Sequence, residues 1–368
     1  MKFFKSAPGP LVHPAGGFDI AWRICYTGSL MANDKTIGNW KALAGIALSL
    51  VFMFLAFRQV SLGQVLLALG RADYWYLLPV LGIIALSLVL RSLRWQVLLA
   101  PMQKVKAGSL FVSLSIGYMA NTFLPAHLGE FVRAWHARKK TGIAASSIFA
   151  TIVVERLIDV FCLLLLLAMA LMVFPFPGWV QKSGAVMLAL VAVASALLLL
   201  MKKYRVQALA ISGRLLRPLP ASLAGRIKGL LEQFLDGVTA LRRPAHYLAV
   251  GVLSLLIWVC YTLTIQLLFF AFAFSGRYRL PWSAALVVTV ITTISVVVPS
   301  SPGYIGSFHF LCQLALGLFA IPKGPALSYA FVLHAVSVFP VFFLGLAFLA
   351  REKLSLNAFK EEADAFDH

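Results

Sequence analysis

Three carboxylates stand alone in a long stretch of this sequence, because Glu130, Glu155 and Asp159 are the only acids between positions 74 and 231. All three lie in or beside apolar segments. In VVERLIDV, Glu155 and Asp159 are four residues apart, so they share one face of a helix. A charge at the centre of a bilayer costs at least a few kcal/mol, so such residues are paired or face a polar cavity. The candidate partners are Arg91, Arg94, Arg133 and Arg156.

Three interpretations of these charges are open. The first is a structural ion-pair network that fixes neighbouring segments to one another. The second is that the same network lines a polar pocket for a lipid headgroup. The third is a catalytic carboxylate pair, but no nucleophile with its base accompanies these acids. We expect no cofactor and no metal site, because Cys and His lack metal-binding spacing. The isolated cysteines, expected to be free thiols, are Cys25, Cys162, Cys260 and Cys312.

The composition is that of a membrane protein. Of the 368 residues, 61% are hydrophobic and 12% are charged, about half the charged fraction of a soluble domain. Runs of about 20 apolar residues can cross a hydrocarbon core about 30 Å thick. Long apolar runs occupy 42–57, 75–90, 144–174, 184–201, 246–274, 282–298 and 326–350. We expect an all-α polytopic membrane protein. Its net charge of +19 then indicates loops that face anionic lipid rather than a nucleic-acid surface.

The distribution of Lys and Arg predicts that two apolar segments turn back inside the membrane. If 108–131 and 282–320 return to the face they came from, 25 of the 32 Lys and Arg residues fall on one face and 6 on the other. If 108–124 crossed instead, the basic stretches 132–140 and 202–243 would move to the wrong face. We therefore expect about six spanning helices plus two re-entrant hairpins, with both termini in the cytoplasm.

The two hairpin tips share the pattern P-x-x-x-G-x-F, in PAHLGEF from Pro125 to Phe131 and in PGYIGSF from Pro302 to Phe308. Three spans separate the hairpins, and an odd number inverts one relative to the other, as in an inverted-topology repeat. Irregular backbone inside a membrane must be buried or face water, so the tips are expected to line a cavity. A helix that begins there favours an anion. The polar residues near the tips are Asn121, His127, Ser300, Ser301, Ser307 and His309. Each of them could equally cap a broken helix.

The stretches GYMANTFLPAHLGEFVRAW, ERLID and PSSPGYIGSFHF resemble the lysylphosphatidylglycerol synthase transmembrane-domain family, also called flippase-like membrane proteins. The resemblance covers roughly residues 40–350. It implies an integral membrane fold and, in the best-known members, movement of aminoacylated phosphatidylglycerol between leaflets. The positions that match the family motifs are Asn121, Pro125, Gly129, Glu130, Arg133, Glu155, Arg156, Asp159, Pro299, Gly303 and Gly306. Family members often have a glutamate where this chain has His309 and paired glycines where it has Gly303-Tyr304, departures that concern the substrate more than the fold.

Together these patterns predict a flippase-like protein that translocates or binds a lipid or lipid-linked substrate. The residues expected to line its headgroup cavity are Arg94, Asn121, Pro125, Gly129, Glu130, Arg133, Glu155, Arg156, Asp159, Pro302, Gly303, Gly306, Ser307 and His309. We expect no enzyme, since the chain shows neither a Walker-type ATP motif nor the soluble aminoacyl-transferring domain of a complete synthase. The alternatives are a membrane-embedded lipid-modifying transferase and a non-transporting assembly partner of lipid-biosynthesis enzymes.

The expected organisation places one membrane domain between two tails in a bacterial inner membrane. Residues 1–39 are expected to be a disordered extension, and MANDKT at Met31 is typical of a natural start. The half-repeats, linker and tail are expected at about 75–174, 246–350, 203–243 and 351–368. Within the linker, apolar residues that share one helical face are Leu223, Ile227, Leu231, Phe234, Val238 and Leu241. This helix is expected either to lie on the cytoplasmic interface or to pack against the protein itself.

Overall fold

A computed structural model describes residues 48–352, apart from position 59, residues 125–127, most of 175–202, 216–220, 239–243 and 298–301. The expected tails at 1–39 and 353–368 lie outside the described residues, as do Pro125, His127, Ser300 and Ser301. All the regular structure in the described ranges is helical. The expectation of an all-α fold is therefore confirmed.

Four described helices are long and apolar enough to cross a membrane. They are α4 (Leu77–Leu99), extended at its start by the short η1 (Tyr74–Tyr76), and α7 (Ala145–Val173), α11 (Pro244–Ala271) and α15 (Lys323–Arg351). A helix of 28 residues is about 42 Å long, which exceeds the hydrocarbon core. The structure thus holds four candidate spans in its described part, or five with one bent pair, where the sequence predicts about six. The expected span at 184–201 lies mostly outside the described residues.

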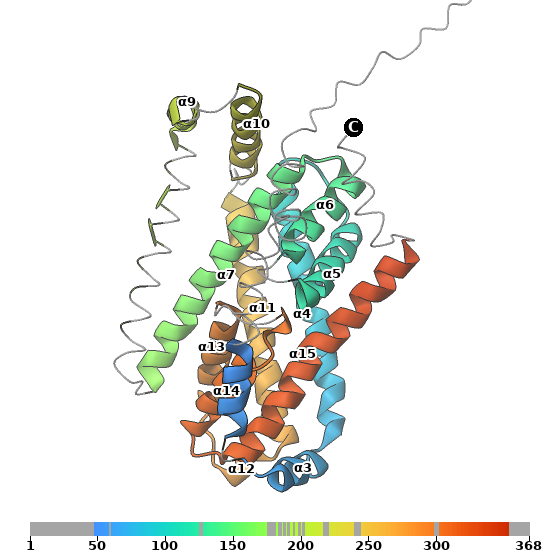
Figure 1. The fold of residues 1–368 in the computed structure, drawn as a ribbon, viewed down its shortest axis with the longest axis vertical. Helices are drawn as coiled ribbons and strands as arrows, with labels where there is room; N and C mark the ends of the chain where they lie inside the picture. The colour runs from blue at the N-terminus through green and yellow to red at the C-terminus, as the bar shows by residue number, and fades with distance from the viewer. Residues whose placement is uncertain are drawn as a thin grey trace, which may run out of the picture.

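Two pairs of shorter helices form the expected hairpins. The first pair is α5 (Ala107–Phe123) and α6 (Gly129–Thr141), and the second is α13 (Ala284–Val297) and α14 (Ser307–Gly317), preceded by η3 (Pro302–Tyr304). Even α5, with 17 residues, is only about 25 Å long, so none of the four is long enough to cross alone. Figure 1 shows α5 and α6 in the upper half of the molecule and α13 and α14 in the lower half. The hairpins therefore enter from opposite ends, as an inverted repeat predicts.

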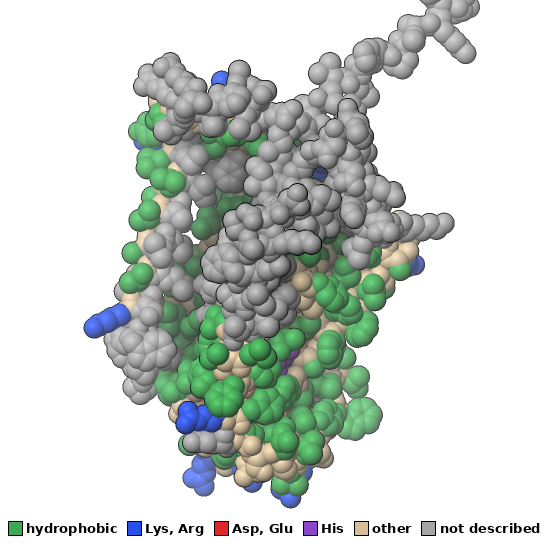
Figure 2. Space-filling view, viewed as in Figure 1, with side chains coloured by type: hydrophobic (Ala, Val, Ile, Leu, Met, Phe, Trp, Pro, Cys, Tyr) green, Lys and Arg blue, Asp and Glu red, His purple; other side chains and the backbone are tan. Residues whose placement is uncertain are grey.

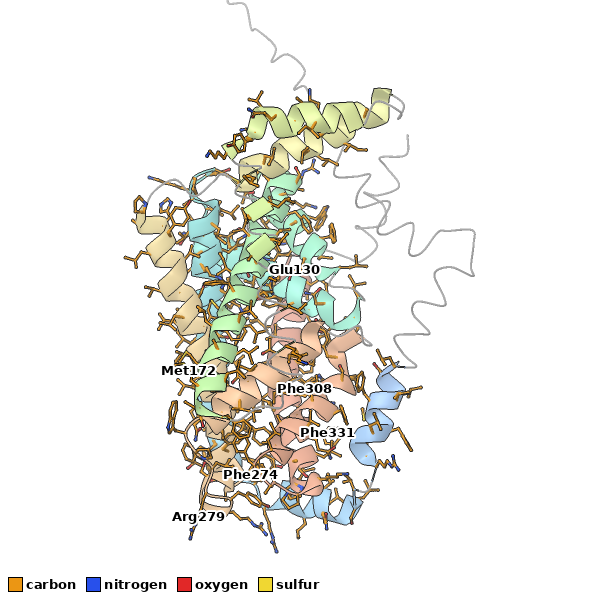
Figure 3. All side chains as sticks on the ribbon, turned by 90° about the vertical axis from the view of Figure 1, so that its left-hand side faces the viewer. Glu130, Met172, Phe274, Arg279, Phe308 and Phe331 are labelled. Atoms are coloured by element: carbon orange, nitrogen blue, oxygen red, sulfur yellow. The ribbon has the colours of Figure 1, made fainter. Side chains whose placement is uncertain are left out.

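The segment between the apolar runs at 42–57 and 75–90 contains a helix. The helix Leu48–Phe57 is followed by α3 (Leu62–Gly70), and the two are bent by 80° relative to each other. In Figures 1 and 3, α3 lies across the lower end of the molecule. It packs on α15 through Val65 and leaves Leu62 and Leu66 exposed. Exposed leucines on a helix that lies across the end of a membrane bundle are typical of an interfacial helix.

The linker forms two helices, α9 (Arg205–Leu215) and α10 (Ala221–Val238), which lie across the upper end in Figure 3. α10 packs along α7, Leu235 is fully buried, and Leu230 adjoins the core between α4, α6 and α7. Of the two expected positions for this amphipathic helix, the contacts with α7 favour packing on the protein itself. A membrane-facing side for α10 remains a prediction.

The surface of the bundle is apolar around its middle. Figure 2 shows hydrophobic side chains over most of the visible described face, with Lys and Arg toward its ends and edges. Large exposed side chains include Phe54, Met172 and Leu248, which would be costly in water and suit lipid. Trp75 and Trp282 are 78% and 76% exposed at the end that holds η1 and the start of α13. Tryptophans in this position mark a membrane–water interface.

Two packed regions fix the hairpins. The larger core lies where α11, α13, α14 and α15 meet, and it includes the fully buried Phe269 and Tyr329. The smaller core lies between α4, α6 and α7 and includes Trp95. The Tyr329 hydroxyl donates to the Ile265 carbonyl, which satisfies the one polar atom of that ring in the apolar core. The smaller core holds the elements that carry the charged residues.

Candidate functional site

Three helices bring seven charged side chains into one group inside the bundle, here named the charge cluster. Its members are Arg91 and Arg94 of α4, Glu130 and Arg133 of α6, and Glu155, Arg156 and Asp159 of α7. The pairs Arg91–Arg94, Glu130–Arg133 and Glu155–Asp159 are three or four residues apart and so share a helix face, whereas Arg156 is one position round from Glu155. Glu155 and Asp159 are about 15 and 21 Å along α7 from its first residue, which places the cluster well inside the span.

The apolar run at 75–90 is shorter than the helix that contains it, so the loop before α5 begins only after Leu99. Arg91 and Arg94 belong to α4, which continues to Leu99, and both side chains are buried. The helix continues past the apolar run because carboxylates of α7 meet these two guanidinium groups inside the bundle. The loop retains Lys104 and Lys106, so the basic character of this end of the molecule remains.

Glu155 is the centre of the charge cluster and is fully buried. Its two oxygens accept from Arg133 Nη2 at 2.8 Å and from Arg156 Nη2 at 2.8 Å. Arg94 Nη2 lies 3.2 Å away and Arg91 Nη1 3.6 Å away. Four arginines around this carboxylate compensate the cost of burying its charge.

Asp159 is held one helical turn further along α7. Its Oδ1 accepts from Arg94 Nη1 at 2.6 Å, a length typical of a charge-assisted bond. Its Oδ2 lies 3.5 Å from Arg156 Nη1 and 3.6 Å from Arg91 Nη1. Arg94 therefore bridges both acids of α7, and the i, i+4 spacing read from the sequence is what lets one guanidinium reach both.

Glu130 is bound more loosely than the other two carboxylates. It lies in the first turn of α6, where the helix dipole favours a negative charge. Its oxygens are 3.6 Å from Arg133 Nη1 and 3.8 Å from Arg156 Nε, too far for hydrogen bonds. Only 7% of this residue is exposed.

Aromatic and hydroxyl groups that sequence reasoning missed complete the surroundings. Arg91 donates to the hydroxyls of Tyr118 on α5 and Tyr261 on α11. The Arg133 guanidinium lies 3.8 Å from the Trp95 ring centroid, a cation–π contact. The tyrosines come from helices far apart in the sequence. Only Tyr118 had a local signal, since it lies in the GYMAN motif.

Close packing of α5 on α6 places Glu130 and Arg133 against α7. A Cβ added at Gly117 would lie 2.6 Å from Arg133 Cβ, and one at Gly129 would collide with the Gly117 carbonyl oxygen and with Asn121. Glycine at positions 117 and 129 is therefore required by the distance between the helices. The sequence motif included Gly129 for this kind of approach, whereas the role of Gly117 was missed.

The site residues predicted on the second hairpin lie at a distance from the charge cluster. Gly303 has φ 71° and Gly306 has φ 94°, values that favour glycine. The His334 Nε2–H donates to the Gly303 carbonyl at 2.7 Å, and His309 lies beside His334 with 4.9 Å between ring centroids. The Ser307 hydroxyl donates to the Tyr304 carbonyl and caps the turn locally. In Figure 3, Glu130 lies above Phe308 and Phe331 of this region.

One point of contact joins the two hairpins. A Cβ added at Gly303 would lie 3.7 Å from the Thr122 carbonyl oxygen, so the second tip rests on the end of α5. Tyr304 lies within electrostatic range of Glu130 and Arg156. The described part of the second tip therefore lies against the end of α5, near the charge cluster. No three His, Cys, Asp or Glu side chains gather as metal ligands in the part of the chain that the structure describes.

A second polar group lies nearer the upper end of the molecule. Ser113 Oγ is 2.8 Å from His136 Nδ1, and His136 Nε2 is 3.0 Å from Glu352 Oε2. The order serine, histidine, acid is one that nucleophilic catalysis uses, and it was not visible in the sequence. Ser113 is fully buried and also contacts the Ser109 carbonyl at 3.1 Å, so we interpret the group as a structural clamp.

The clamp ties the end of α15 to α6. Lys140 Nζ is 2.8 Å from Glu352 Oε2. Burial lowers the pKa of His136 and outweighs the opposing effect of its hydrogen bond to Glu352. For Glu352, burial is outweighed by hydrogen bonds from Lys140 and His136, which lower the pKa of this carboxylate. In the clamp, His136 is therefore favoured as a neutral ring and Glu352 as an anion.

The family model for the lysylphosphatidylglycerol synthase transmembrane region matches residues 42–345. The chain belongs to this family. The match covers every element that contributes to the charge cluster. The resemblance read from the motifs is therefore confirmed.

Two curated relatives are similar to this member of the lysylphosphatidylglycerol synthase transmembrane-region family. The protein named Glycosyltransferase AglD from Haloferax volcanii is 23% identical over 351 residues, covering 87% of this chain and 56% of that protein. A UPF0104 membrane protein from Methanothermobacter thermautotrophicus is 25% identical over 260 residues, covering 67% of this chain and 76% of that protein. The chain thus spans little more than half the length of AglD. No solved structure matches the chain.

Proposed function

We propose that this protein binds the phosphate-bearing headgroup of a membrane lipid at the charge cluster and moves the lipid between leaflets. One observation carries the proposal: four arginines and three carboxylates lie together inside the bundle, with one positive charge in excess. A bilayer-depth charge without a partner is costly, so an excess of one arginine favours an anionic ligand. Arginine is also the side chain best suited to phosphate oxygens.

Access to the cluster supports the same proposal. The Arg156 side chain is 40% exposed, whereas those of Arg94, Arg133 and Glu155 are fully buried. Arg156 is therefore the position at which a headgroup would first meet the cluster. The tip contact between Gly303 and Thr122 lies beside it, and separation of the two hairpins there would open a polar path.

The proposed setting is a bacterial inner membrane with the upper, basic end of the molecule in the cytoplasm. Lys104, Lys106 and Lys139 lie at this end, where anionic lipid of the inner leaflet would attract them. The expected ligands are membrane lipids. Contact with lipid-biosynthesis enzymes is an expectation of the alternative role, in which the chain binds lipid without moving it.

Lipid movement by purified protein in liposomes tests the proposal. A lipid labelled on its headgroup is followed by a membrane-impermeant quencher in vesicles with wild-type protein, with Arg156→Gln and with the control Arg277→Gln at the opposite, exposed end. Wild type and Arg277→Gln should move lipid, and Arg156→Gln should be several-fold slower because it removes the exposed cation. Equal rates in all protein samples and in empty vesicles would exclude transport and favour an assembly role.

A membrane-embedded transferase is the second candidate function. The name of the relative Glycosyltransferase AglD favours it, although this chain spans 56% of that protein. Incubation of the purified chain with lipid and sugar-nucleotide donors, followed by mass spectrometry of the lipids, tests this candidate. A new lipid product that appears only with protein would support it.

A further inference from the structure

Two of the four arginines hold fixed positions on the carboxylates of α7. Glu155 Oε2 accepts a hydrogen bond from Arg133 Nη2 at 2.8 Å. Asp159 Oδ1 accepts one from Arg94 Nη1 at 2.6 Å. Both arginine side chains are fully buried, and both also lie within 3.3 Å of Glu155 Oε1. Asp159 Oδ2 therefore depends on the other two arginines of the charge cluster.

These two arginines, Arg91 and Arg156, approach the same two oxygens from different helices. Arg156 donates to Glu155 Oε1 at 2.8 Å, and its Nη1 lies 3.5 Å from Asp159 Oδ2. Arg91 Nη1 lies 3.6 Å from both of these oxygens. Asp159 Oδ2 is buried and has no hydrogen-bond partner among the described residues. It lies between two guanidinium groups, and a shift of less than about 1 Å brings either group into hydrogen-bond range.

Tyrosine hydroxyls hold Arg91 in its present position. Arg91 donates from Nη1 to the Tyr118 hydroxyl and from Nε to the Tyr261 hydroxyl. Its guanidinium carbon lies 5.5 Å and 5.3 Å from the centroids of the two rings. Among the described residues, Arg91 is thus the one cluster arginine whose hydrogen bonds go to uncharged groups. The surplus positive charge of the cluster therefore lies on Arg91 in this arrangement.

The exposure of Arg156 gives the shared oxygens a use. Its side chain is 40% exposed, so it is the cluster arginine that can turn outward to an anion. Its departure would leave Asp159 Oδ2 and Glu155 Oε1 with less positive charge beside them, and a buried carboxylate without compensation is strongly destabilising. Arg91 is already within 3.6 Å of both oxygens and comes from another helix. A short movement of Arg91 therefore replaces what Arg156 takes away.

We propose that Arg91 is a positioning residue that exchanges with Arg156 on Glu155 Oε1 and Asp159 Oδ2. In the arrangement described above, Arg156 holds these oxygens and Arg91 rests on the two tyrosine hydroxyls. In the exchanged arrangement, Arg91 holds the oxygens and Arg156 is free to bind an anion. The inference rests on the proposed function in one respect, the arrival of a lipid headgroup at Arg156. It adds the residue that keeps the carboxylates compensated while the headgroup is bound.

Chemical modification of Arg156 tests the exchange without any lipid. Phenylglyoxal reacts faster with free guanidinium groups than with those held in ion pairs. The purified full chain in detergent is treated with this reagent, and mass spectrometry of its peptides compares modification of Arg156 with that of the exposed Arg277. Arg91→Gln should slow the modification of Arg156, because its competitor for the carboxylates is gone. Tyr261→Phe should accelerate it, because Arg91 loses a resting partner and turns to the carboxylates.

The expected changes are several-fold, since one hydrogen bond to a charged group corresponds to about tenfold or more in population. Arg71→Gln on α3 and Tyr247→Phe on α11 are matched controls at exposed positions and should give the wild-type rate. A merely structural role would change the rate in the same direction in Arg91→Gln and Tyr261→Phe, because both would loosen the bundle. Any pattern other than slower in the first and faster in the second would overturn the exchange.

A second tyrosine variant keeps the test decisive if one variant fails to fold. Tyr118→Phe removes the other resting partner of Arg91 and should accelerate modification of Arg156 as Tyr261→Phe does. An unchanged or slower rate in a folded tyrosine variant would contradict the resting position of Arg91 and with it the exchange.

The liposome assay separates the exchange from the proposed function. Arg91→Gln should move the headgroup-labelled lipid several-fold more slowly than wild type, because Arg156 stays on the carboxylates. A wild-type rate of lipid movement in Arg91→Gln would overturn its role as a positioning residue. If the modification rates change as expected but wild type moves no lipid, the exchange stands and transport is excluded. If wild type moves lipid but the modification rates do not change, the exchange is overturned and the proposed function stands.

Discussion

At the scale of single residues, the charge cluster is a set of ion pairs held inside membrane helices. Buried ion pairs rarely stabilise a protein more than apolar residues of the same volume would, whereas breaking one pair leaves a charge without compensation. Glu155 has four arginines within 3.6 Å, so no single arginine accounts for its position. Such redundancy suits a site in which one arginine must turn to a ligand while the carboxylate stays neutralised.

Glu155→Gln should destabilise the protein strongly. The substitution keeps the shape but leaves Arg94 and Arg133, both fully buried, without their shared counter-charge. Loss of one partner of a buried pair costs about 3–5 kcal/mol. The midpoint of thermal unfolding in detergent, followed by circular dichroism, measures the loss, with Glu232→Gln as a control at a less buried position on α10. An unchanged midpoint would mean that the arginines find other partners and that Glu155 is not the centre of the cluster.

Whether these contacts could be predicted depends on how far apart in the sequence the contacting residues lie. The pairing of Glu155 and Asp159 with arginines followed from helical spacing and from the cost of charge in lipid. The tyrosines that bind Arg91 could not be predicted, because Tyr261 is 170 residues away and nothing local marks it. The same holds for His136 and Glu352, which are 216 residues apart. Arg91 and Arg94 were predicted as partners of these acids, but the apolar run at 75–90 stops before them and does not show that the helix continues to Leu99.

At the scale of elements, the hairpins depend on glycine more than on any other residue type. The shared pattern places a glycine at both tips. A bulky residue at Gly306 would be expected to block a lipid path in a folded protein, but the structure contradicts that expectation: Gly306 has φ 94°, and an added Cβ would collide with the Ser49 carbonyl oxygen of the helix Leu48–Phe57. Gly306→Trp would therefore disturb the fold and could not test transport.

Both ends of the first hairpin should be accessible from one side of the membrane. In a background with the native cysteines replaced by serine, Lys104→Cys before α5 and Lys139→Cys near the end of α6 are labelled with a membrane-impermeant maleimide in oriented vesicles. Both positions are exposed, as is Trp282, which serves as the control for the other side. Lys104→Cys and Lys139→Cys should react from the same side and Trp282→Cys from the other. Reaction of the first two from opposite sides would contradict the re-entrant hairpin.

The clamp between α6 and α15 should weaken as the pH falls. A group whose pKa is lowered by folding contributes stability above its unfolded pKa and loses that contribution as the pH decreases. His136, with an ordinary pKa of 6.5, therefore stabilises fully above that value and less below it, and Glu352 follows below 4.5. The thermal midpoint of the wild type should fall between pH 7 and pH 5.

His136→Gln keeps hydrogen bonding at the clamp but cannot take up a proton, so its thermal midpoint should change less over this range of pH. His246→Gln, at a half-buried position near the start of α11, is the matched control. If His136→Gln and the wild type lose stability in parallel, the clamp is not the source of the pH dependence.

At the scale of the whole molecule, two hairpins from opposite ends meet beside a charged group that lies inside the span. The first hairpin packs on α4, α7 and α15, and the second packs on α11 and α15, so α15 contacts both. Gly303 of the second tip also lies on the backbone at the end of α5. If the two hairpins separate without unfolding, this contact must open. That both tips line a cavity stays a prediction of the sequence.

A disulfide across the tips should stop lipid movement reversibly. A Cβ added at Gly303 would lie 3.9 Å from Thr122 Cγ2, so Thr122→Cys with Gly303→Cys is close to disulfide geometry. The positive φ at Gly303 costs a cysteine there about 1–2 kcal/mol. The native cysteines are replaced, and a protease site is placed within 216–220, between the two new cysteines. After cleavage, the fragments of oxidised chains should stay linked and migrate at full length on a non-reducing gel. The fragments of the control, Thr122→Cys with Trp282→Cys, should separate. If separation of the hairpins admits the headgroup, the oxidised protein should not move lipid in liposomes, and reductant should restore its activity. Full activity of the cross-linked protein would contradict this, because lipid would then pass while the tips stay together.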